Sequence, residues 1–346
     1  MKLALHHILL SSAIIASSAF VPSTVTQPRH RISFSLNVSP KPLQAATLSI
    51  DETKEEIRDA SETEKPTEVT ERRKTVLDDG FIFGLENSGL ERPKGKQALL
   101  VIEDDSLETK PYQVAIVATT LTAHSLLSLN SISDILAQQN GDVLSTATIA
   151  GSVLLSSWLL ADLGSGIFHW SVDNYGNGKT PLLGSIIAAF QGHHTAPWTI
   201  TQRGFCNNTY KLCTPFGIPT MLAIHALTGP ATTLFFAAFC TLEIMSQEFH
   251  KWSHTTKKQG PQWVNTLQDA GVTVARKQHA LHHMAPYDGN YCIVSGAWNE
   301  MLDKSGFFRR LEKIIYDWNG VESNAWKLDP ELRARTLRGE YTPNKQ

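Results

Sequence analysis

Eight histidines in four short-spaced groups constrain the fold of this 346-residue chain more than any other feature. Residues three or four positions apart share one face of an α-helix, so closely spaced histidines can present their ring nitrogens to one point. Four groups with compatible spacings are rare by chance, and a fold that joins them must bring distant segments together. The groups are His169, His193 with His194, His250 with His254, and His279 with His282 and His283.

The residue types in these groups predict a metal centre. Imidazoles without thiolates suit iron, zinc, copper or nickel, and eight candidate ligands are twice what one tetrahedral zinc uses, so we expect two metal ions. The four cysteines contain no CxxC pair, which excludes a thiolate zinc site and a disulfide scaffold. Two irons bound mainly by imidazoles can activate oxygen to remove hydrogen from an unactivated C–H bond, which side chains alone cannot do.

Two apolar stretches ahead of His169 predict a membrane hairpin. Residues 114–129 and 143–163 flank a polar turn at 130–142, and the region from 111 to 163 contains only three charged side chains, all aspartates. Lysines precede the first stretch and follow the second, whereas the turn has none. Because positive charge collects on the cytosolic side of a membrane, both ends of the hairpin should face the cytosol or, in a plastid, the stroma.

A second apolar region, 215–245, is interrupted at Gly229 and Pro230. Each half would be roughly 22 Å long as a helix, too short for a hydrocarbon core of about 30 Å. A single span would place His250 across the membrane from His169, so we infer a hairpin or re-entrant pair that returns to the same side. The predicted fold class is all-α: an integral membrane helical protein with about four membrane segments in two hairpins and a histidine-rich di-iron cap on the stromal side.

The first 50 residues have a targeting composition, because they contain no Asp or Glu and many Ser, Thr and Pro. A basic start, an apolar run and small residues before a cleavage position after Ala19 predict a signal peptide over 1–19. The junction at 16–22 resembles the two-part presequence of algae with secondary plastids. This resemblance implies a transit segment over 20–50 and import into a plastid, with a plain secretory signal as the alternative.

The composition changes abruptly after the presequence. Residues 51–79 contain 11 acidic and 6 basic side chains and almost no large apolar ones, which is too little apolar surface to offset the entropy of ordering them. We therefore expect an acidic, largely disordered linker over 51–110, a membrane domain over 111–316 and a polar C-terminal tail over 317–346. The net charge of -2 offers no basic field for nucleic acid, so no nucleic-acid partner is expected.

Four segments around the histidines form one composite motif. They are 162–170 (DLGSGIFHW), His193-His194 followed by Pro197, 250–254 (HKWSH), and 276–283 (RKQHALHH) followed by Pro286. This pattern resembles the Kua family of membrane desaturases, which includes animal plasmanylethanolamine desaturase and the plant plastid enzyme that makes trans-3-hexadecenoic acid on phosphatidylglycerol. The likeness covers about 112–316 and implies a desaturase domain whose eight histidines are the catalytic di-iron ligands. Gln191 departs from the pattern, because animal members carry a charged residue there.

Two aspartates near His169 are candidates for binding the cofactor. Asp162 lies seven residues before His169 and Asp173 lies four residues after it, so both can share its helical face. Either carboxylate could accept the second ring proton of His169 or ligate a metal directly. A surface or capping role is the alternative for each of them.

The resemblance and the presequence together imply one expected function. It is a plastid acyl-lipid desaturase that uses two Fe ions and O2 to introduce a trans-3 double bond into palmitate esterified to phosphatidylglycerol. The expected location is the thylakoid or inner envelope membrane of an alga with a secondary plastid. A ferredoxin-type electron donor is implied, because the chain has no flavin, haem or nicotinamide fingerprint. The alternatives are a plasmanylethanolamine desaturase-like enzyme or hydroxylase acting on another lipid, and a non-catalytic membrane anchor for a soluble partner.

Overall fold

The computed structural model describes residues 97–101 and 105–342, and every regular element within them is a helix. The all-α class predicted from the sequence is therefore confirmed for this part of the chain. The predicted signal peptide, transit segment and most of the acidic linker lie outside the described residues, as do the last four residues of the predicted tail.

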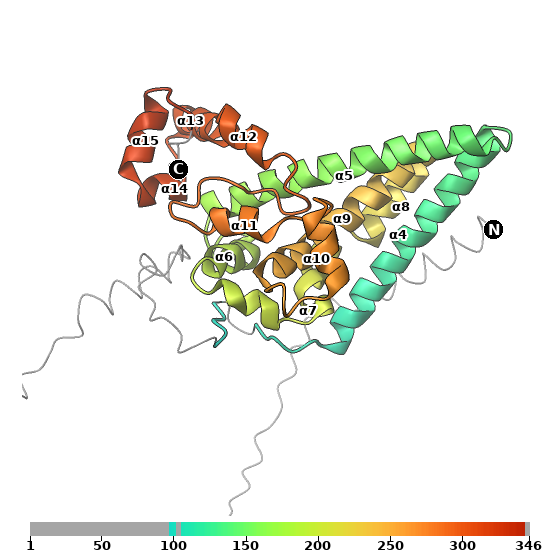
Figure 1. Cartoon of the computed structure of the whole chain (residues 1–346), viewed down its shortest axis with the longest axis horizontal. Helices are drawn as coiled ribbons and strands as arrows, with labels where there is room; N and C mark the ends of the chain where they lie inside the picture. Colours follow the sequence, from blue (N-terminus) through green and yellow to red (C-terminus); the bar gives the residue numbers. More distant parts are fainter. Residues whose placement is uncertain (1–96, 102–104, 343–346) are drawn as a thin grey trace, which may run out of the picture.

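Two long helices, α4 (Pro111–Gln138) and α5 (Val143–Asn174), form the arms of a V (Figure 1). Asn140 and Gly141 turn the chain with positive φ angles, and the Asp142 side chain then accepts a hydrogen bond from the Leu144 amide at 3.0 Å, which caps α5. Both helices are long and apolar enough to cross a membrane, as predicted for the first hairpin.

The apolar side chains of this hairpin face outward rather than into the protein. Only 33% of the most apolar window of α4 and 17% of that of α5 is buried. Leu129, Leu144 and Leu155 are each more than half exposed. A core helix of a water-soluble protein would bury this surface, so the exposed apolar face is what contact with lipid requires.

The second apolar region breaks where the sequence predicts. Helix α8 (Ile218–Leu227) ends just before Gly229, and α9 (Pro230–His254) begins at Pro230, which occupies the first helical turn where its missing N–H is tolerated. Helix α8 folds back along α9, because Ile218 and Met221 pack in one cluster with Ala237 and Cys240.

The two halves of this second hairpin differ from the prediction in length. Helix α8 has only 10 residues, about 15 Å, whereas α9 has 25 residues and continues past the apolar region to His254. Among the residues that the structure describes, only α4 and α5 meet the length and composition of a membrane span. Four complete spans are therefore not confirmed, and α8 is a short helix packed within the V.

Helix α9 lies between the two arms of the V and packs against both of them. At the closed end, Leu234 packs with Ile135 of α4 and Ala150 of α5. Toward the open end, Ile244 packs with Val117 of α4. Helix α9 therefore runs from the closed end to the open end beside α5, and it carries its C-terminal histidines to the end where α5 also finishes.

The remaining helices gather at the open end of the V and beyond it (Figure 1). In chain order they are α6 (Gly184–His193), the 3-10 helix η1 (Pro197–Gln202), α7 (Phe205–Thr209), the 3-10 helix η2 (Tyr210–Cys213), α10 (Gln262–Asp269), α11 (Arg276–His282), α12 (Asn299–Ser305), α13 (Phe307–Asn319), α14 (Asn324–Leu328) and α15 (Pro330–Leu337).

The segment expected to be a polar tail contains ordered helices. Trp326 of α14 is 1% exposed. It packs in one cluster with Ala325 of the same helix and with Leu332 of α15. The Asn324 side chain donates a hydrogen bond to the Asp173 carbonyl at 2.8 Å, so this part of the chain is fastened to the end of α5. Two tryptophans, Trp318 and Trp326, in an otherwise polar stretch gave too weak a signal to predict this packing.

The end of the predicted linker is also packed against the domain. The Leu99 amide donates to Thr199 Oγ1 at 3.0 Å, and the Trp198 indole donates to the Gln97 carbonyl at 2.8 Å. Asp105 forms an ion pair with Arg203. Residues 97–101 and 105–110 are therefore part of the folded unit.

A glycine pair on α5 tests the contact between this helix and the loop over 283–298. A Cβ atom on Gly166 would overlap Cys292 Sγ and lie 3.3 Å from the Cys292 backbone, whereas a Cβ atom on Gly151 would meet nothing within 4 Å. We expect Gly166→Ala to destabilise the protein by about 1–3 kcal/mol through overpacking. We expect Gly151→Ala to stabilise it slightly, by up to about 1 kcal/mol, because alanine favours helix. Thermal unfolding of the purified full chain in detergent measures both, and equal behaviour of the two variants would contradict the contact.

Candidate metal centre

The structure brings all eight histidines together where α5, α6, α9 and α11 meet. Helix α5 supplies His169, and α9 supplies His250 and His254 from its last two turns. The end of α6 supplies His193 and His194. Helix α11 and its C-cap supply His279, His282 and His283. The fold therefore brings the four groups of histidines together, as a shared metal site requires.

The ligand atoms form two groups, and within each group all of them lie within 4.8 Å of one another. The five-histidine group contains His193, His250, His254, His279 and His283. The aspartate group contains His169, Asp173, His194 and His282. Neighbouring histidines thus separate into different groups, because consecutive residues of a helix project about 100° apart.

Asp173 is the centre of the aspartate group. Its Oδ2 atom lies 3.1 Å from His194 Nε2, 3.3 Å from His169 Nε2 and 3.5 Å from His282 Nε2. Atoms bound to one metal ion at about 2.0–2.2 Å are roughly 2.8–3.6 Å apart in octahedral or tetrahedral geometry. The separations in this group are those of ligands around one metal ion.

The five-histidine group has the same spacing. His254 Nε2 lies 2.9 Å from His193 Nε2 and 2.8 Å from His279 Nε2. His283 Nε2 lies 3.1 Å from His279 Nε2. All four rings therefore turn the same nitrogen toward a common point.

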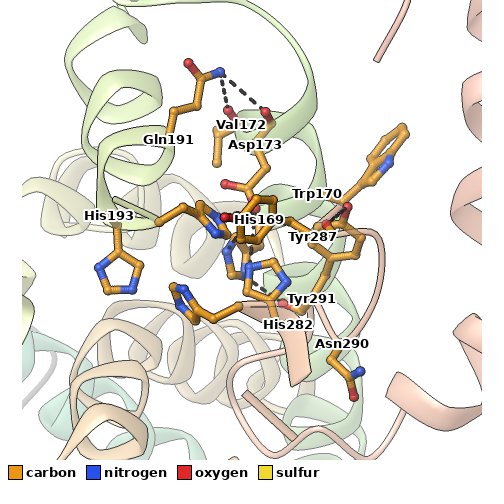
Figure 2. A network of polar contacts seen from close by, with 12 residues as sticks. His169, Trp170, Val172, Asp173, Gln191, His193, His282, Tyr287, Asn290 and Tyr291 are labelled. Atoms are coloured by element: carbon orange, nitrogen blue, oxygen red, sulfur yellow. Dashed lines mark hydrogen bonds and ion pairs between the residues drawn. The ribbon is translucent and has the colours of Figure 1, made fainter. Parts of the chain in front are cut away.

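Backbone carbonyls fix the tautomers of two rings in the aspartate group. His169 Nδ1 donates to the Tyr291 carbonyl at 3.0 Å, and His282 Nδ1 donates to the Gly289 carbonyl at 2.9 Å. The proton is held on Nδ1, so the Nε2 lone pair of each ring points toward Asp173 (Figure 2). Both carbonyls belong to the loop over 283–298, and no side-chain pattern in the sequence indicated them.

Asp162, the other predicted cofactor-binding aspartate, lies in neither group. Its carboxylate is fully buried and accepts hydrogen bonds from the amides of Ser295 at 2.7 Å, Gly296 at 2.8 Å and Trp298 at 3.2 Å. Asp162 therefore anchors the loop whose carbonyls orient His169 and His282. The structure brings only Asp173 of the two aspartates to the histidines.

Gln191 of α6 holds the end of α5. Its Nε2 atom donates to the Val172 carbonyl at 3.1 Å and lies 3.4 Å from the Asp173 carbonyl (Figure 2). The amide thus satisfies carbonyls that have no partner within the helix. It also fixes the backbone from which the Asp173 carboxylate projects.

Buried nitrogens without partners show that these residues fit metal ions. Both ring nitrogens of His250 and Nδ1 of His279 are buried and have no hydrogen-bond partner among the described residues. Leaving such an atom unsatisfied costs about 1–3 kcal/mol, and a metal bond to His250 would remove one of these penalties. Burial also lowers the pKa of His193, His279 and His283 well below the usual value, and that of His254 to about 3. The rings are therefore neutral near pH 7, which metal ligation requires.

The remaining histidines and the cysteines of the described residues are not part of the centre. His124 and His225 lie in neither group. All four cysteines are free thiols. Cys206 and Cys213 share an apolar cluster with Val117 and Ile244.

Fold and site together define a helical protein with an outward-facing apolar hairpin and a cluster of histidines that fits a metal centre. Comparison with known proteins shows that residues 158–326 match the lipid desaturase domain. This match confirms the resemblance to membrane desaturases that the histidine segments predicted.

Named relatives of this domain come from plants and animals. The chain is 47% identical over 171 residues to fatty acid desaturase 4, chloroplastic, of Arabidopsis thaliana, covering 49% of this chain and 53% of the relative. It is 44% identical to fatty acid desaturase 4-like 1, chloroplastic, of the same plant, covering 49% and 58%. It is 34% identical to plasmanylethanolamine desaturase 1 of Mus musculus, covering 48% and 65%. The chain thus spans little more than half the length of these plant relatives, and no solved structure matches it significantly.

The division into two groups predicts metal stoichiometry. We expect Asp173→Asn to lower the metal content of the purified chain from about two ions to about one, because the amide loses the charge at the centre of the aspartate group. Asp162→Asn, which removes a buried charge from a loop anchor, should reduce stability more than metal content. Elemental analysis of both variants measures this, and equal metal loss in the two would contradict the grouping.

The buried neutral histidines predict acid sensitivity of the metal-free protein. Unfolded histidines bind protons near pH 6.5, whereas burial holds the pKa of folded His254 at about 3. The unfolded state therefore binds more protons, and stability falls as pH decreases from about 6.5 toward 3, by up to about 1.4 kcal/mol per pH unit for each such histidine. Thermal unfolding of the metal-free chain between pH 7 and pH 4 measures the slope, and His254→Gln should reduce it by one proton. A slope that His254→Gln leaves unchanged would argue against a neutral, buried His254.

Proposed function

We propose that this chain is a plastid membrane acyl-lipid desaturase, dependent on two Fe ions and O2, that introduces a trans-3 double bond into palmitate esterified to phosphatidylglycerol. The observation that carries the proposal is the convergence of eight histidines and Asp173 into two adjacent ligand groups. The lipid desaturase domain over 158–326 and the names of its relatives support the reaction type.

The donor set suits a pair of irons. His169, His194, His282 and Asp173 would hold one iron, and the five-histidine group would hold the other. Bound iron would supply oxygen activation and the removal of two hydrogens from adjacent carbons of an acyl chain, a reaction that side chains cannot perform. The overall balance is one O2 and two electrons with two protons consumed for each double bond, and two waters formed.

The chain itself contributes position and exclusion of water. His169 is 0% exposed and packs edge-on against the Phe190 ring, with centroids 5.3 Å apart. The carbonyls of Tyr291 and Gly289 hold two rings in the ligating tautomer. The Asp173 carboxylate brings negative charge to the aspartate group. This charge would offset the positive charge of a bound metal ion, which neutral imidazoles cannot do.

The membrane assignment follows from α4 and α5. The exposed apolar surface of these helices supports insertion as a hairpin, and α8 with the first part of α9 would enter from the same side without crossing. Lysines outside the hairpin turn favour a stromal orientation of the metal centre. We assign the protein to the thylakoid or inner envelope membrane of an alga with a secondary plastid, supported by the chloroplastic relatives and the acid-free presequence.

The electron donor would be a soluble protein of the ferredoxin type. The reaction needs two electrons, and the sequence has no fingerprint for a flavin, haem or nicotinamide. A metal centre on the stromal side would be within reach of such a carrier.

A second candidate keeps the chemistry and changes the lipid. The 34% identity to plasmanylethanolamine desaturase 1 supports this candidate. Its product would be a vinyl ether in a plasmanyl lipid. Hydroxylation of a lipid could begin with the same C–H cleavage. The higher identity to chloroplastic fatty acid desaturase 4 supports the acyl-lipid substrate instead. An intact set of nine ligands argues against a non-catalytic anchor.

The lipid profile of a photosynthetic bacterium expressing the full chain tests the proposal. We expect a trans-3 double bond to appear in the phosphatidylglycerol palmitate, and His282→Ala to reduce it at least 100-fold because a ligand of the aspartate group is lost. His225→Ala is the matched control, since His225 lies on α8 outside both groups, and it should keep the wild-type product.

The alternatives give different products in the same experiment. An enol ether or hydroxylated lipid would select the second candidate. A chain that is present and holds two irons but changes no lipid would contradict desaturase activity in that host. A chain without iron would favour the anchor.

A further inference from the structure

Two peptide units of the loop over 283–298 connect histidines of the aspartate group to helix α12. In the first unit, the Gly289 carbonyl accepts a hydrogen bond from His282 Nδ1 at 2.9 Å. The amide of the same unit, which belongs to Asn290, donates to Asp303 Oδ2 of α12 at 3.1 Å. A continuous path of hydrogen bonds therefore runs from the Asp303 carboxylate through one peptide unit to the ring of His282.

The second unit, between Tyr291 and Cys292, is arranged in the same way. Its carbonyl accepts a hydrogen bond from His169 Nδ1 at 3.0 Å, and its amide donates to Asn299 Oδ1 at 2.8 Å. The buried Asn299 side chain also donates from Nδ2 to the Cys292 carbonyl at 3.1 Å. This position uses both an acceptor and a donor, which an amide offers and an ionised carboxylate does not.

Helix α12 explains why the two supporting side chains occur together. Asn299 and Asp303 lie four residues apart, so they share one face of the helix. The amide of Trp298, the N-cap of α12, donates to Asp162 Oδ2 at 3.2 Å, which fixes the start of the helix to α5. Leu302 is 4% exposed and packs in one cluster with residues of the loop. Helix α12 is therefore held at a set position against both α5 and the loop.

The residues of the first peptide unit suit a close approach of the carboxylate. A Cβ atom on Gly289 would lie 2.8 Å from Asp303 Oδ2 and 3.2 Å from its Cγ atom, closer than a rigid side chain can come. Asn290 has a φ angle of 55°, in the left-handed region that asparagine tolerates better than most residues. The pair therefore permits a backbone that directs its carbonyl to His282 and its amide to Asp303.

Charge distinguishes the two supports. Burial raises the pKa of Asp303 to about 6, so its carboxylate is mainly ionised at pH 7, whereas Asn299 is neutral. An ionised acceptor forms a stronger hydrogen bond than a neutral one. A stronger bond to the amide of a peptide unit polarises the carbonyl of that unit, because linked hydrogen bonds reinforce one another. A histidine that donates to a stronger acceptor is in turn a more basic metal ligand.

We propose that Asp303 is a positioning residue of the metal centre, which acts through the 289–290 peptide unit to orient His282 and to strengthen its Nε2 atom as a metal ligand. Asn299 orients His169 through the 291–292 unit without adding charge. The two rings therefore differ in basicity although each donates to a backbone carbonyl. The inference rests on the metal centre of the proposed function, and it does not depend on the lipid or on the reaction.

Metal affinity tests the proposal without turnover. The metal-depleted full chain in detergent is titrated with Zn²⁺, and the site that Asp173→Asn removes is taken as the aspartate group. We expect Asp303→Asn to weaken this site about tenfold, as loss of a partner behind a ligating histidine does. Glu300→Gln is the matched control, because Glu300 is an exposed carboxylate of the same helix that pairs with Lys304. It should leave the affinity unchanged.

A spectroscopic readout separates the effect of charge from a structural effect. Asparagine at position 303 still offers an oxygen to the Asn290 amide, so the loop should keep its conformation. In the zinc-loaded chain with ¹⁵N-labelled histidine, the Nδ1–H signals of His169 and His282 are assigned by their loss in His169→Gln and His282→Gln. We expect Asp303→Asn to move the His282 proton signal upfield, because its hydrogen bond weakens, and to leave the His169 signal in place.

Other outcomes overturn the proposal in distinguishable ways. An unchanged zinc affinity and an unchanged His282 signal in Asp303→Asn would remove Asp303 from the centre and leave the proposed function standing. Equal movement of both histidine signals would mean that the substitution disturbs the whole loop, which also overturns the selective action on His282. A wild-type chain that binds no zinc at the aspartate group would overturn the metal centre, and with it the proposed function. If wild type oxidises no lipid but Asp303→Asn has both expected effects, the desaturase assignment fails and the role of Asp303 stands.

Discussion

The gathering of eight imidazoles and one carboxylate into two adjacent groups, with six of these side chains buried and three partly buried, is the constraint on which the rest of the structure depends. Eight imidazoles and one carboxylate can be held out of water only if the frame is rigid, because each unsatisfied nitrogen is costly and like groups gain nothing from one another. The V of α4 and α5 with α9 between its arms supplies that frame. Helix α9 extends about two turns beyond its apolar part, which is what delivers His250 and His254 to the end of α5.

One face of α5 organises most of the centre. Asp162, Gly166, His169 and Asp173 recur every three or four residues, so they line a single side of the helix. Asp162 and Gly166 receive the loop over 283–298, whose carbonyls orient two histidine rings. His169 and Asp173 join the ligands themselves, and the Asp173 carbonyl also receives the Asn324 side chain from α14. Ligand geometry is thus transmitted from one helix through hydrogen bonds to segments far away in the chain.

The sequence predicted the parts of this arrangement that depend on periodicity and on length. Helical spacing identified the grouped histidines, and the break at Gly229 was predicted because a continuous span would have separated His250 from His169. The backbone partners of the His169 and His282 rings could not be predicted, because the Tyr291 and Gly289 carbonyls leave no trace in the pattern of side chains. Asp162 and Asp173 were indistinguishable from spacing alone. Only the folded loop shows that one anchors amides and the other meets imidazoles.

The separation of neighbouring histidines into different groups has a mechanical consequence. The rings of His193 and His194 are 6.2 Å apart between centroids, and those of His282 and His283 are 5.3 Å apart, yet each pair serves both groups. At each of these two places, residues that are adjacent in the chain contribute to different groups, so one peptide unit joins the two groups there. Bending of the long helices in a bilayer would therefore move both groups together, because at each place the two Cα atoms are held about 3.8 Å apart by one peptide unit.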